Sequence, residues 1–324
     1  MLILVTGATG FIGGHLVQAL LRSGHEVRAI VRESSNYERL SSNGVEIKKG
    51  SLVDPESVSA ACRNVDVVFN LAAKLGGQAV KVDEMRQVNV QAVRVLLEAC
   101  QRNNVRQVIH CSTPGVVGMS GVAPECLPYR PSALYERTKC DGEKTALAYH
   151  KNNHVAVTVI RPDFVYGPGD LHKLKLFKAI KEDRFPLIGS GRSLLHPTYV
   201  DDVVSGCLIT MENPAAFGEI FNIAGPRPVT VFELAKVISN TLGLRSTRKN
   251  VPVILAKLAA YGAEAAAGIL NHEPPLTRYQ VNFFTRDHAS DTSKAEQTLG
   301  FEPQVSLSDG IQQTVEWYID QGYL

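Results

Sequence analysis

The sequence predicts an α/β protein, in which a doubly wound parallel sheet carries a smaller, mostly helical C-terminal domain. Two observations predict this fold class. Strand-like and helix-like patterns alternate through the first 160 residues, and a glycine-rich turn joins the first strand to the first helix. Repeated units of this kind form parallel sheets with helices on both faces and ligands at the carboxyl ends of the strands.

The alternating part of the chain consists of strand-like segments separated by amphipathic helical patterns. The last three strands are apolar almost throughout, which is typical of parallel strands that are buried on both faces. We expect strands at 2–6, 26–31, 45–48, 66–70, 106–111 and 156–160, and helices at 11–23, 55–62, 82–102 and 133–151.

The alternation ends after residue 162, where prolines separate shorter elements. We therefore expect one domain at 1–165, to which 196–224 returns, and a second domain formed by 166–195 and 225–324. The helical patterns in this part lie at 171–182, 201–211, 230–242, 252–270, 292–299 and 306–320.

The composition is that of an ordinary soluble globular protein, with 44% apolar and 20% charged residues in 324. A net charge of +2 without a basic stripe argues against nucleic acid as a partner. The six cysteines have no CxxC or His/Cys metal spacing, so we expect reduced thiols, no metal and a cytoplasmic location. No charged segment precedes the first strand, and we expect no signal peptide.

The stretch 251–270 is about as long as a membrane span. It contains Lys257 and Glu264 and is rich in alanine rather than leucine. We expect a core or lid helix and no stable membrane insertion, with a helix on a membrane surface as the alternative.

The glycine turn after the first strand indicates a phosphate cradle. Gly7 permits a tight turn, Gly10 lets the backbone approach a pyrophosphate, and Gly13 lets helix and strand pack closely. The first N–H groups of the following helix have no partner within the helix, so they point at whatever binds there. We therefore expect the first domain to bind a dinucleotide and the second to bind the substrate.

The end of the second strand bears on which dinucleotide binds. NAD-selective folds place an acidic residue there, whereas this chain has Val31 followed by Arg32. A guanidinium suits the 2′-phosphate of NADP(H) because its planar fork binds phosphate bidentately. We expect NADP(H) to be preferred and NAD(H) to be possible. Alternatively, Arg32 is a solvated surface charge, and Glu33 beside it would weaken a phosphate site.

Tyr135 and Lys139 stand four residues apart in a helical pattern, and therefore on one helix face. A free phenol has a pKa of about 10, too high for easy proton transfer near neutrality. A lysine and a positive nicotinamide ring both favour phenolate and lower that pKa. The pair is therefore a candidate general acid/base, although two surface residues on a helix would give the same pattern.

The strands before and after this helix end in further motifs at the carboxyl edge of the predicted sheet. The chain contains TGATGFIG at 6–13, NLAA at 70–73, STPGVVG at 112–118, YERTK at 135–139, RPDFVYGPGD at 161–170, HPTYVDDVV at 196–204, FNIAG at 221–225 and SKAEQTLGFEP at 293–303. As a set, these motifs resemble the extended short-chain dehydrogenase/reductase superfamily, also called the NAD-dependent epimerase/dehydratase family. The resemblance covers nearly the whole chain and implies a Rossmann fold.

The resemblance implies a role for each residue that matches a family motif. Tyr135 would be the general acid/base, Lys139 would tune it and bind the nicotinamide ribose, and Thr113 would hydrogen-bond the substrate oxygen. The residues implied to bind the cofactor are Gly7, Gly10, Phe11, Ile12, Gly13, Arg32, Leu52, Leu71, Ala72, Ala73, Asn89, Tyr135, Lys139, Pro162 and Val165. Phe11 and Ile12 would lie beside the pyrophosphate, and Pro162 and Val165 would flank the nicotinamide.

Two departures from the family pattern bear on how the adenine would bind and on which reactions the resemblance implies. Ser51 and Leu52 stand where the family often has an Asp that binds adenine, so that hydrogen bond is weaker here. Pro114 and Gly115 follow Thr113, where dehydratases of the family have Asp-Glu. The acid and base for water loss are therefore missing, which argues strongly against 4,6-dehydration.

We expect the substrate contacts to be Lys74, Thr113, Tyr135 and His196. Lys74 opens a glycine-hinged loop at 74–78, which we expect to close over a substrate, with plain flexibility as the alternative. For His196, a structural bond to a neighbouring carbonyl is the alternative. The segment 274–278 and the apolar helix before it look like the 3β-hydroxysteroid dehydrogenase-type relatives, which act on alcohols or ketones with apolar bodies.

We expect an oxidoreductase that transfers hydride reversibly between nicotinamide and a secondary alcohol or ketone. The alternative is a nucleotide-sugar epimerase, similar to UDP-hexose 4-epimerases, with tightly retained NAD. A non-catalytic redox sensor is a third reading, but it would have lost the Tyr135/Lys139 pair. By resemblance, helices 82–102 and 133–151 would form a homodimer contact, and the only other partner expected is a small-molecule substrate.

Overall fold

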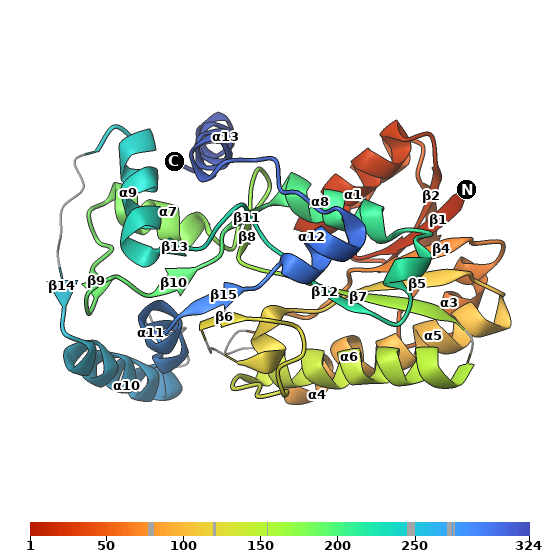
Figure 1. Ribbon diagram of the computed structural model, residues 1–324, viewed down its shortest axis with the longest axis horizontal. Coiled ribbons are helices and arrows are strands. Elements are labelled where there is room, and N and C mark those ends of the chain that lie inside the picture. The colour runs from red at the N-terminus through yellow and green to blue at the C-terminus, as the bar shows by residue number, and fades with distance from the viewer. Residues whose placement is uncertain (77–80, 119–120, 154, 245–249, 271–273, 275) are drawn as a thin grey trace.

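The centre of the molecule is a seven-stranded sheet in the order β12-β7-β5-β4-β1-β2-β3, with every neighbouring pair parallel (Figure 1). The computed structural model describes residues 1–324 except 77–80, 119–120, 154, 245–249, 271–273 and 275. The sheet strands are β1 (Leu2–Thr6), β2 (Glu26–Val31), β3 (Glu46–Lys49), β4 (Val67–Asn70), β5 (Gln107–Cys111), β7 (Ala156–Pro162) and β12 (Ile220–Ile223). The order reverses between β1 and β4, as in doubly wound folds that bind dinucleotides, which confirms the predicted fold class.

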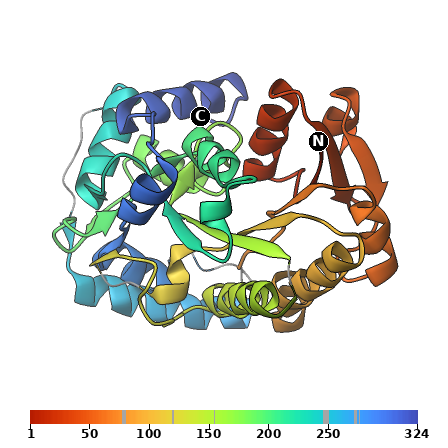
Figure 2. The ribbon, with the colours of Figure 1, turned by 45° about the vertical axis from the view of Figure 1, so that its right-hand side comes forward.

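Helices cover both faces of this sheet (Figure 2). Leu16, Val203 and Ala295 belong to the core of one face, which is covered by α1 (Phe11–Arg22), α8 (Val200–Thr210) and α12 (Ser293–Leu299). The core of the other face contains Val58 and Leu96 and is covered by α3 (Pro55–Cys62), α5 (Ala92–Arg102) and α6 (Leu134–Asn153). Because both faces are covered, successive strand side chains are buried whichever way they point.

The C-terminal part is built around a smaller four-stranded sheet in the order β13-β10-β15-β6. Its strands are β13 (Val229–Thr230), β10 (Leu194–Leu195), β15 (His288–Ser290) and β6 (Gly121–Ala123), and two-stranded pairs are formed by β8 (Val165–Tyr166) with β11 (Thr198–Tyr199) and by β9 (Leu187–Ile188) with β14 (Asn250–Val251). The helices of this part are α7 (Leu174–Lys181), α9 (Val231–Thr241), α10 (Val253–Leu270), α11 (Arg278–Thr285) and α13 (Leu307–Asp320).

Two segments cross the domain division expected from the sequence. β6 lies within 1–165 but pairs with β15 of the smaller sheet. α12 lies within 225–324, yet Ala295 and Leu299 pack in the core of the main sheet. β12 joins the main sheet beside β7, so 196–224 contributes an edge strand there. The two parts are therefore interleaved along the chain.

The predicted helix at 82–102 is interrupted. It consists of α4 (Val82–Arg86), a π-helical turn at Gln87–Gln91 and α5, which then runs without a break to Arg102. Such wide turns are frequent at functional sites.

α10 occupies the segment that is as long as a membrane span. Among the residues with a described placement, no helix is both long and apolar enough to cross a membrane. Ala256 and Ala260 of α10 pack against Ile188 and Val281, whereas Leu258 on the opposite face is 64% exposed. The helix therefore packs through its small residues.

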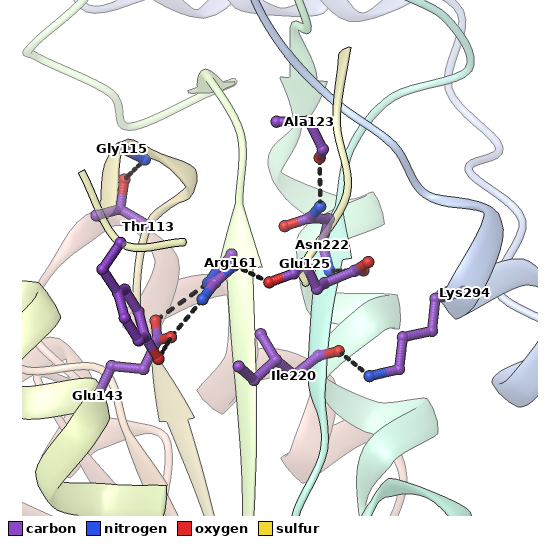
Figure 3. Close-up of polar contacts among 10 residues, drawn as sticks. Thr113, Gly115, Ala123, Glu125, Glu143, Arg161, Ile220, Asn222 and Lys294 are labelled. Carbon is purple, nitrogen blue, oxygen red and sulfur yellow. Dashed lines mark hydrogen bonds and ion pairs between the residues drawn. The ribbon is translucent and has the colours of Figure 1, made fainter. Parts of the chain in front are cut away.

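A buried ion pair joins α6 to β7 at the centre of the fold. Arg161 of β7 is 1% exposed and donates from Nε and one terminal nitrogen to the two carboxylate oxygens of Glu143, which is fully buried. Its remaining terminal nitrogen donates to the Glu125 carbonyl at 3.2 Å, and the Tyr129 hydroxyl donates to Glu143 at 2.9 Å (Figure 3). Each guanidinium nitrogen of Arg161 and each carboxylate oxygen of Glu143 therefore has a partner.

We expect Arg161→Met to lower the free energy of unfolding by about 3–5 kcal/mol, because it leaves the Glu143 carboxylate buried without its cation. Urea denaturation followed by circular dichroism measures this change. The double variant Arg161→Met/Glu143→Leu regains part of the loss, since it removes both charges. A single variant within about 1 kcal/mol of the unmodified protein would contradict the assigned role of the pair.

Candidate active site

The turn between β1 and α1 forms the cradle predicted from its glycines. Gly7 has a φ of +71°, and a Cβ there would lie 2.8 Å from the Ala72 nitrogen. A Cβ on Gly13 would lie 2.1 Å from the Gly7 carbonyl oxygen, so helix and strand touch at this glycine. Gly10 is the N-cap of α1, with no side-chain cap and no acidic residue in the first turn. The N–H groups of Phe11 and Ile12 are thus available to bind an anion. The pyrophosphate of a dinucleotide is an anion that fits this position.

Arg32 follows β2 directly and is exposed. Within the described residues its guanidinium makes no ion pair. Glu33, which the sequence suggested as an obstacle to phosphate binding, pairs instead with Lys49 at 3.3 Å. Leu52 is half-buried and packs against the core beneath α3. Adenosine binds at this edge of the sheet in this fold. The edge carries the cations Arg32 and Lys49, and the carboxylate of Glu33 is paired with Lys49.

The loop after β4 runs alongside the glycine turn. Leu71 and Ala72 are half-buried and Ala73 is exposed, and the Ala72 nitrogen donates to the Thr6 hydroxyl at 3.2 Å. Lys74 points its ammonium at Glu84, 3.4 Å away. The loop then passes Tyr135, since a Cβ on Gly76 would lie 3.9 Å from the Tyr135 Cβ. Gly77 and Gln78, which were expected to complete the loop, lie outside the described residues.

Asn89 has a different placement from the one expected of a cofactor ligand. It sits in the π-helical turn, is 1% exposed, and exchanges two hydrogen bonds with the Lys74 backbone at 2.8 and 3.0 Å. Its amide also donates to the Thr138 hydroxyl at 2.9 Å, which in turn donates to the Tyr135 carbonyl. Asn89 is therefore engaged by protein groups and ties the loop after β4 to the turn of α6 that carries Tyr135.

Lys139 lies on the inner face of α6, where it is 2% exposed and donates from Nζ to the Cys111 carbonyl at 2.6 Å. Burial lowers the pKa of Lys139. Burial, with smaller contributions from Cys111, Tyr279 and Glu136, raises the pKa of Tyr135. The sequence-based expectation of a lowered phenol pKa is thus not met by the protein groups alone, because burial dominates and the neighbouring groups that act on the phenol raise its pKa as well.

Thr113 lies two residues after β5 and caps the short helical turn Pro114–Val117. Its hydroxyl accepts a hydrogen bond from the Gly115 nitrogen at 3.4 Å (Figure 3). Gly115 in turn touches the helix of the tyrosine, because a Cβ there would lie 2.9 Å from the Glu136 Cγ. The loop of Thr113 and the first turn of α6 are therefore in direct contact. The predicted residues Thr113 and Tyr135 therefore lie on two segments that pack against each other.

On the other side of the sheet edge, Pro162 ends β7 and is buried, and Val165 is half-buried in β8. Phe164 between them has a φ of +29°, a strained value for a residue with a bulky side chain. The strained residue lies between the two positions expected to flank the nicotinamide.

The structure does not present His196 to a ligand. The residue is 3% exposed, and its two ring nitrogens lie 3.0 Å from the Ser290 carbonyl oxygen and 2.8 Å from that of Gly225. Its place in the substrate set is therefore corrected to the structural alternative. His196 holds β15 and the loop after β12 together.

Sequence reasoning missed a group of residues from α11 and β15 that faces the tyrosine helix. The Tyr279 hydroxyl donates to the Glu136 carboxylate at 3.0 Å, and the rings of Tyr279 and Phe283 lie 6.3 Å apart. Glu136 also accepts from the backbone and hydroxyl of Ser132 at the start of the helix. No motif identifies these contacts, because they join positions more than a hundred residues apart. Among the described residues no His, Cys, Asp or Glu group is arranged to hold a metal ion.

Comparison with known proteins agrees with this geometry. The model of the NAD dependent epimerase/dehydratase family matches residues 3–224. A 2-alkyl-3-oxoalkanoate reductase from Stenotrophomonas maltophilia is 29% identical over 96% of this chain and 97% of its own. A 3β-hydroxysteroid dehydrogenase/Δ5→4-isomerase from Mycobacterium tuberculosis is 28% identical over 98% of this chain and 90% of its own.

Solved structures show the same architecture. The UDP-glucuronic acid 4-epimerase from Bacillus cereus, in complex with NAD, superposes with a TM-score of 0.78 at 29% identity, covering 98% of this chain and 96% of that one. The family model spans well over half of the sequence, and the similar proteins are dehydrogenases, reductases and epimerases. The chain belongs to the NAD-dependent epimerase/dehydratase family of enzymes, within the extended short-chain dehydrogenase/reductase superfamily.

Proposed function

We propose that this protein is an NAD(P)-dependent oxidoreductase that interconverts a secondary alcohol and a ketone, with Tyr135 as the general acid/base. The observation that carries this proposal is the contact between the Thr113 loop and the first turn of α6, with Lys139 held against the Cys111 carbonyl. These contacts support a site at the carboxyl edge of the sheet in which the hydroxyl of Thr113, the phenol of Tyr135 and the ammonium of Lys139 would act together.

Bound nicotinamide would supply the hydride acceptor or donor, and this chain's residues would handle the proton. Thr113 is positioned to donate a hydrogen bond to the substrate oxygen. Because burial raises the pKa of Tyr135, the phenol is neutral at rest and suited to donating its proton to a ketone oxygen. In the oxidative direction, the positive charge of Lys139 and of an oxidised ring would favour loss of that proton.

The cofactor is proposed to be NADP(H) in preference to NAD(H). The exposed Arg32 guanidinium lies at the end of β2, and Lys49 ends the neighbouring strand β3. Glu33 is paired with Lys49, so it leaves the Arg32 guanidinium uncompensated within the described residues. The similar epimerase structure was solved with NAD, which keeps NAD(H) as the second possibility.

A nucleotide-sugar epimerase with tightly retained NAD is the second candidate function. It is favoured by the 29% identity and full-length superposition with the UDP-glucuronic acid 4-epimerase. The similarity to reductases and steroid dehydrogenases over at least 96% of this chain, and the aromatic residues of α11 beside Glu136, favour the oxidoreductase.

We propose that the substrate is a small molecule. We also propose that the protein is cytoplasmic. The six cysteines are free thiols, which agrees with a reducing compartment. Lys74 lies in the loop that passes Tyr135, so its ammonium is available to a substrate once it leaves Glu84.

We expect Tyr135→Phe to lower kcat at least 10²-fold while the cofactor still binds, because general acid–base catalysis contributes roughly 10²–10⁴. Steady-state oxidation of a panel of secondary alcohols, together with cofactor titration by fluorescence, measures both quantities. Tyr149→Phe is the matched control, since that hydroxyl makes an exposed hydrogen bond to Gln101 near the C-terminal end of α6. A near-normal kcat for Tyr135→Phe would remove the tyrosine from the mechanism.

Arg32→Ala should weaken NADPH binding by about tenfold or more and leave NADH binding almost unchanged, since charge-assisted hydrogen bonds to phosphate contribute roughly 1.5–3 kcal/mol. Isothermal titration of each cofactor into the stripped enzyme gives the ratio. Arg39→Ala, on an exposed arginine of the nearby helix Glu38–Ser42, is the control. An unchanged NADPH/NADH ratio for Arg32→Ala would make Arg32 a solvated surface charge.

A homodimer is also proposed, through α5 and α6. The apolar side chains of α5 are all buried within one chain, so they are not available to a second copy. The outer face of this region instead carries the ion pairs Arg94–Glu98 and Arg86–Asp141. We therefore expect a polar, salt-sensitive dimer in light scattering at micromolar concentration, and a monomer at low salt would exclude it.

A further inference from the structure

His288 lies where the smaller sheet meets the reacting edge of the main sheet. It begins β15, opposite Leu195 of β10 and Gly121 of β6. Its side chain is 10% exposed, so the ring is largely buried but still reachable. The mechanism proposed above makes no use of this imidazole.

One side of the His288 ring faces Asp163, the residue that follows β7 and Pro162. The ring nitrogen Nδ1 lies 3.5 Å from an Asp163 carboxylate oxygen, and the Ser290 hydroxyl donates to the other oxygen at 2.6 Å. Asp163 is 1% exposed. The opposite nitrogen, Nε2, makes no hydrogen bond to any residue that the structure describes, and with Nδ1 turned to the carboxylate it is a directed donor.

An aromatic row connects this imidazole to the catalytic tyrosine. Phe283 of α11 lies 5.0 Å from the His288 ring and is stacked on Phe164 at 6.0 Å. On its other side it contacts Tyr279, whose hydroxyl bonds Glu136, the neighbour of Tyr135. His288 therefore shares an apolar wall with the reacting edge.

The charges around His288 favour its protonated form. Burial by itself lowers the pKa of His288, but the hydrogen bond and charge of Asp163, with a smaller contribution from Glu136, raise it above the ordinary value. Lys173 adds a second cation on the same wall, with Nζ 4.7 Å above the Phe164 ring. The Glu136 carboxylate accepts hydrogen bonds from Tyr279 and from backbone donors at the start of α6, and no hydrogen bond joins it to the imidazole in the described part of the chain.

We propose that His288 is a specificity-determining residue that binds a carboxylate close to the reacting carbon, so that the enzyme acts on 3-hydroxy and 3-oxo acids with apolar chains. This inference rests on the proposed alcohol–ketone oxidoreductase function. The aromatic row would hold the chain, and Nε2 would donate a charge-assisted hydrogen bond to the acid. The similar reductase named for 2-alkyl-3-oxoalkanoates agrees with an acid of this class.

The test compares 3-hydroxydecanoate with 2-nonanol, which has a similar chain but no carboxylate. We expect the unmodified enzyme with NADP⁺ or NAD⁺ to prefer the acid in kcat/KM. His288→Leu should lower the acid-to-alcohol ratio by about tenfold or more, mainly through KM, because a buried site that loses a charged donor discriminates by this amount. His288→Gln, which keeps a donor near the position of Nε2, should retain part of the preference.

His172→Leu, on an exposed histidine before α7, is the control and should leave the ratio unchanged. Decanoate, which lacks the reacting hydroxyl, should compete with the acid in the unmodified enzyme and compete poorly in His288→Leu. An unmodified enzyme that oxidises 2-nonanol as well as the acid, or a His288→Leu enzyme with an unchanged ratio, would overturn the assignment of His288. An enzyme that oxidises no secondary alcohol at all would overturn the proposed function itself, and with it this inference.

The pH dependence gives an independent readout. Because the protonated imidazole binds the carboxylate, the acid-to-alcohol ratio should fall as pH rises through the raised pKa of His288. Asp163→Asn removes the carboxylate that raises this pKa, so the fall should move to lower pH. A ratio that is independent of pH in both enzymes would contradict the charged contact.

Discussion

A buried ion pair between Glu143 of α6 and Arg161 of β7 fixes the helix that carries the reacting groups. Tyr135, Lys139 and Glu143 follow one another at intervals of four residues, so they form one stripe along the inner face of α6. With Glu143 bound to Arg161 and Lys139 bound to the Cys111 carbonyl, the helix is held to β7 and β5 at two levels. The position of the tyrosine follows from these contacts.

A second polar connection runs beneath the proposed cofactor site. The Thr6 hydroxyl donates to the Asn70 side chain at 2.8 Å, and the Asn70 amide lies 3.0 Å from a ring nitrogen of His110. These residues lie at the same level of β1, β4 and β5. Burial, and then the charge of Lys139, lowers the pKa of His110, so the imidazole is neutral. A row of neutral polar side chains thus links the glycine turn to the strand beside the lysine.

Local patterns were sufficient to predict the main sheet, and they place Tyr135 and Lys139 on one helix, where their catalytic roles stay a proposal. Buried parallel strands and glycine turns have strong sequence signals, because their requirements are met within a few residues. The same patterns misplaced His196 and Asn89, whose partners at Ser290, Gly225 and Thr138 come from distant segments. An imidazole or an amide has the same appearance in the sequence whether its partner is a ligand or a backbone carbonyl.

Long-range pairing also explains what could not be predicted at all. β6 has only three residues, and its sequence shows no alternating or continuous apolar pattern that would predict a strand. It forms a strand by pairing with β15. The π-helical turn follows from the fit of Asn89 against α6, where a Cβ on Gly142 would lie 2.2 Å from the Asn89 carbonyl oxygen. The Asp163–His288 contact is of the same long-range kind, since it joins the residue after β7 to the start of β15.

The most direct test of an exchanging nicotinamide cofactor is made on the purified protein. The bound dinucleotide is released by denaturation and identified, and NADPH and NADH are then titrated into the stripped enzyme. We expect a cofactor that exchanges freely, with NADPH favoured, because the glycine cradle opens beside an uncompensated Arg32. NAD(H) retained through purification at one molecule per chain would contradict the oxidoreductase and identify an epimerase that re-reduces its own intermediate.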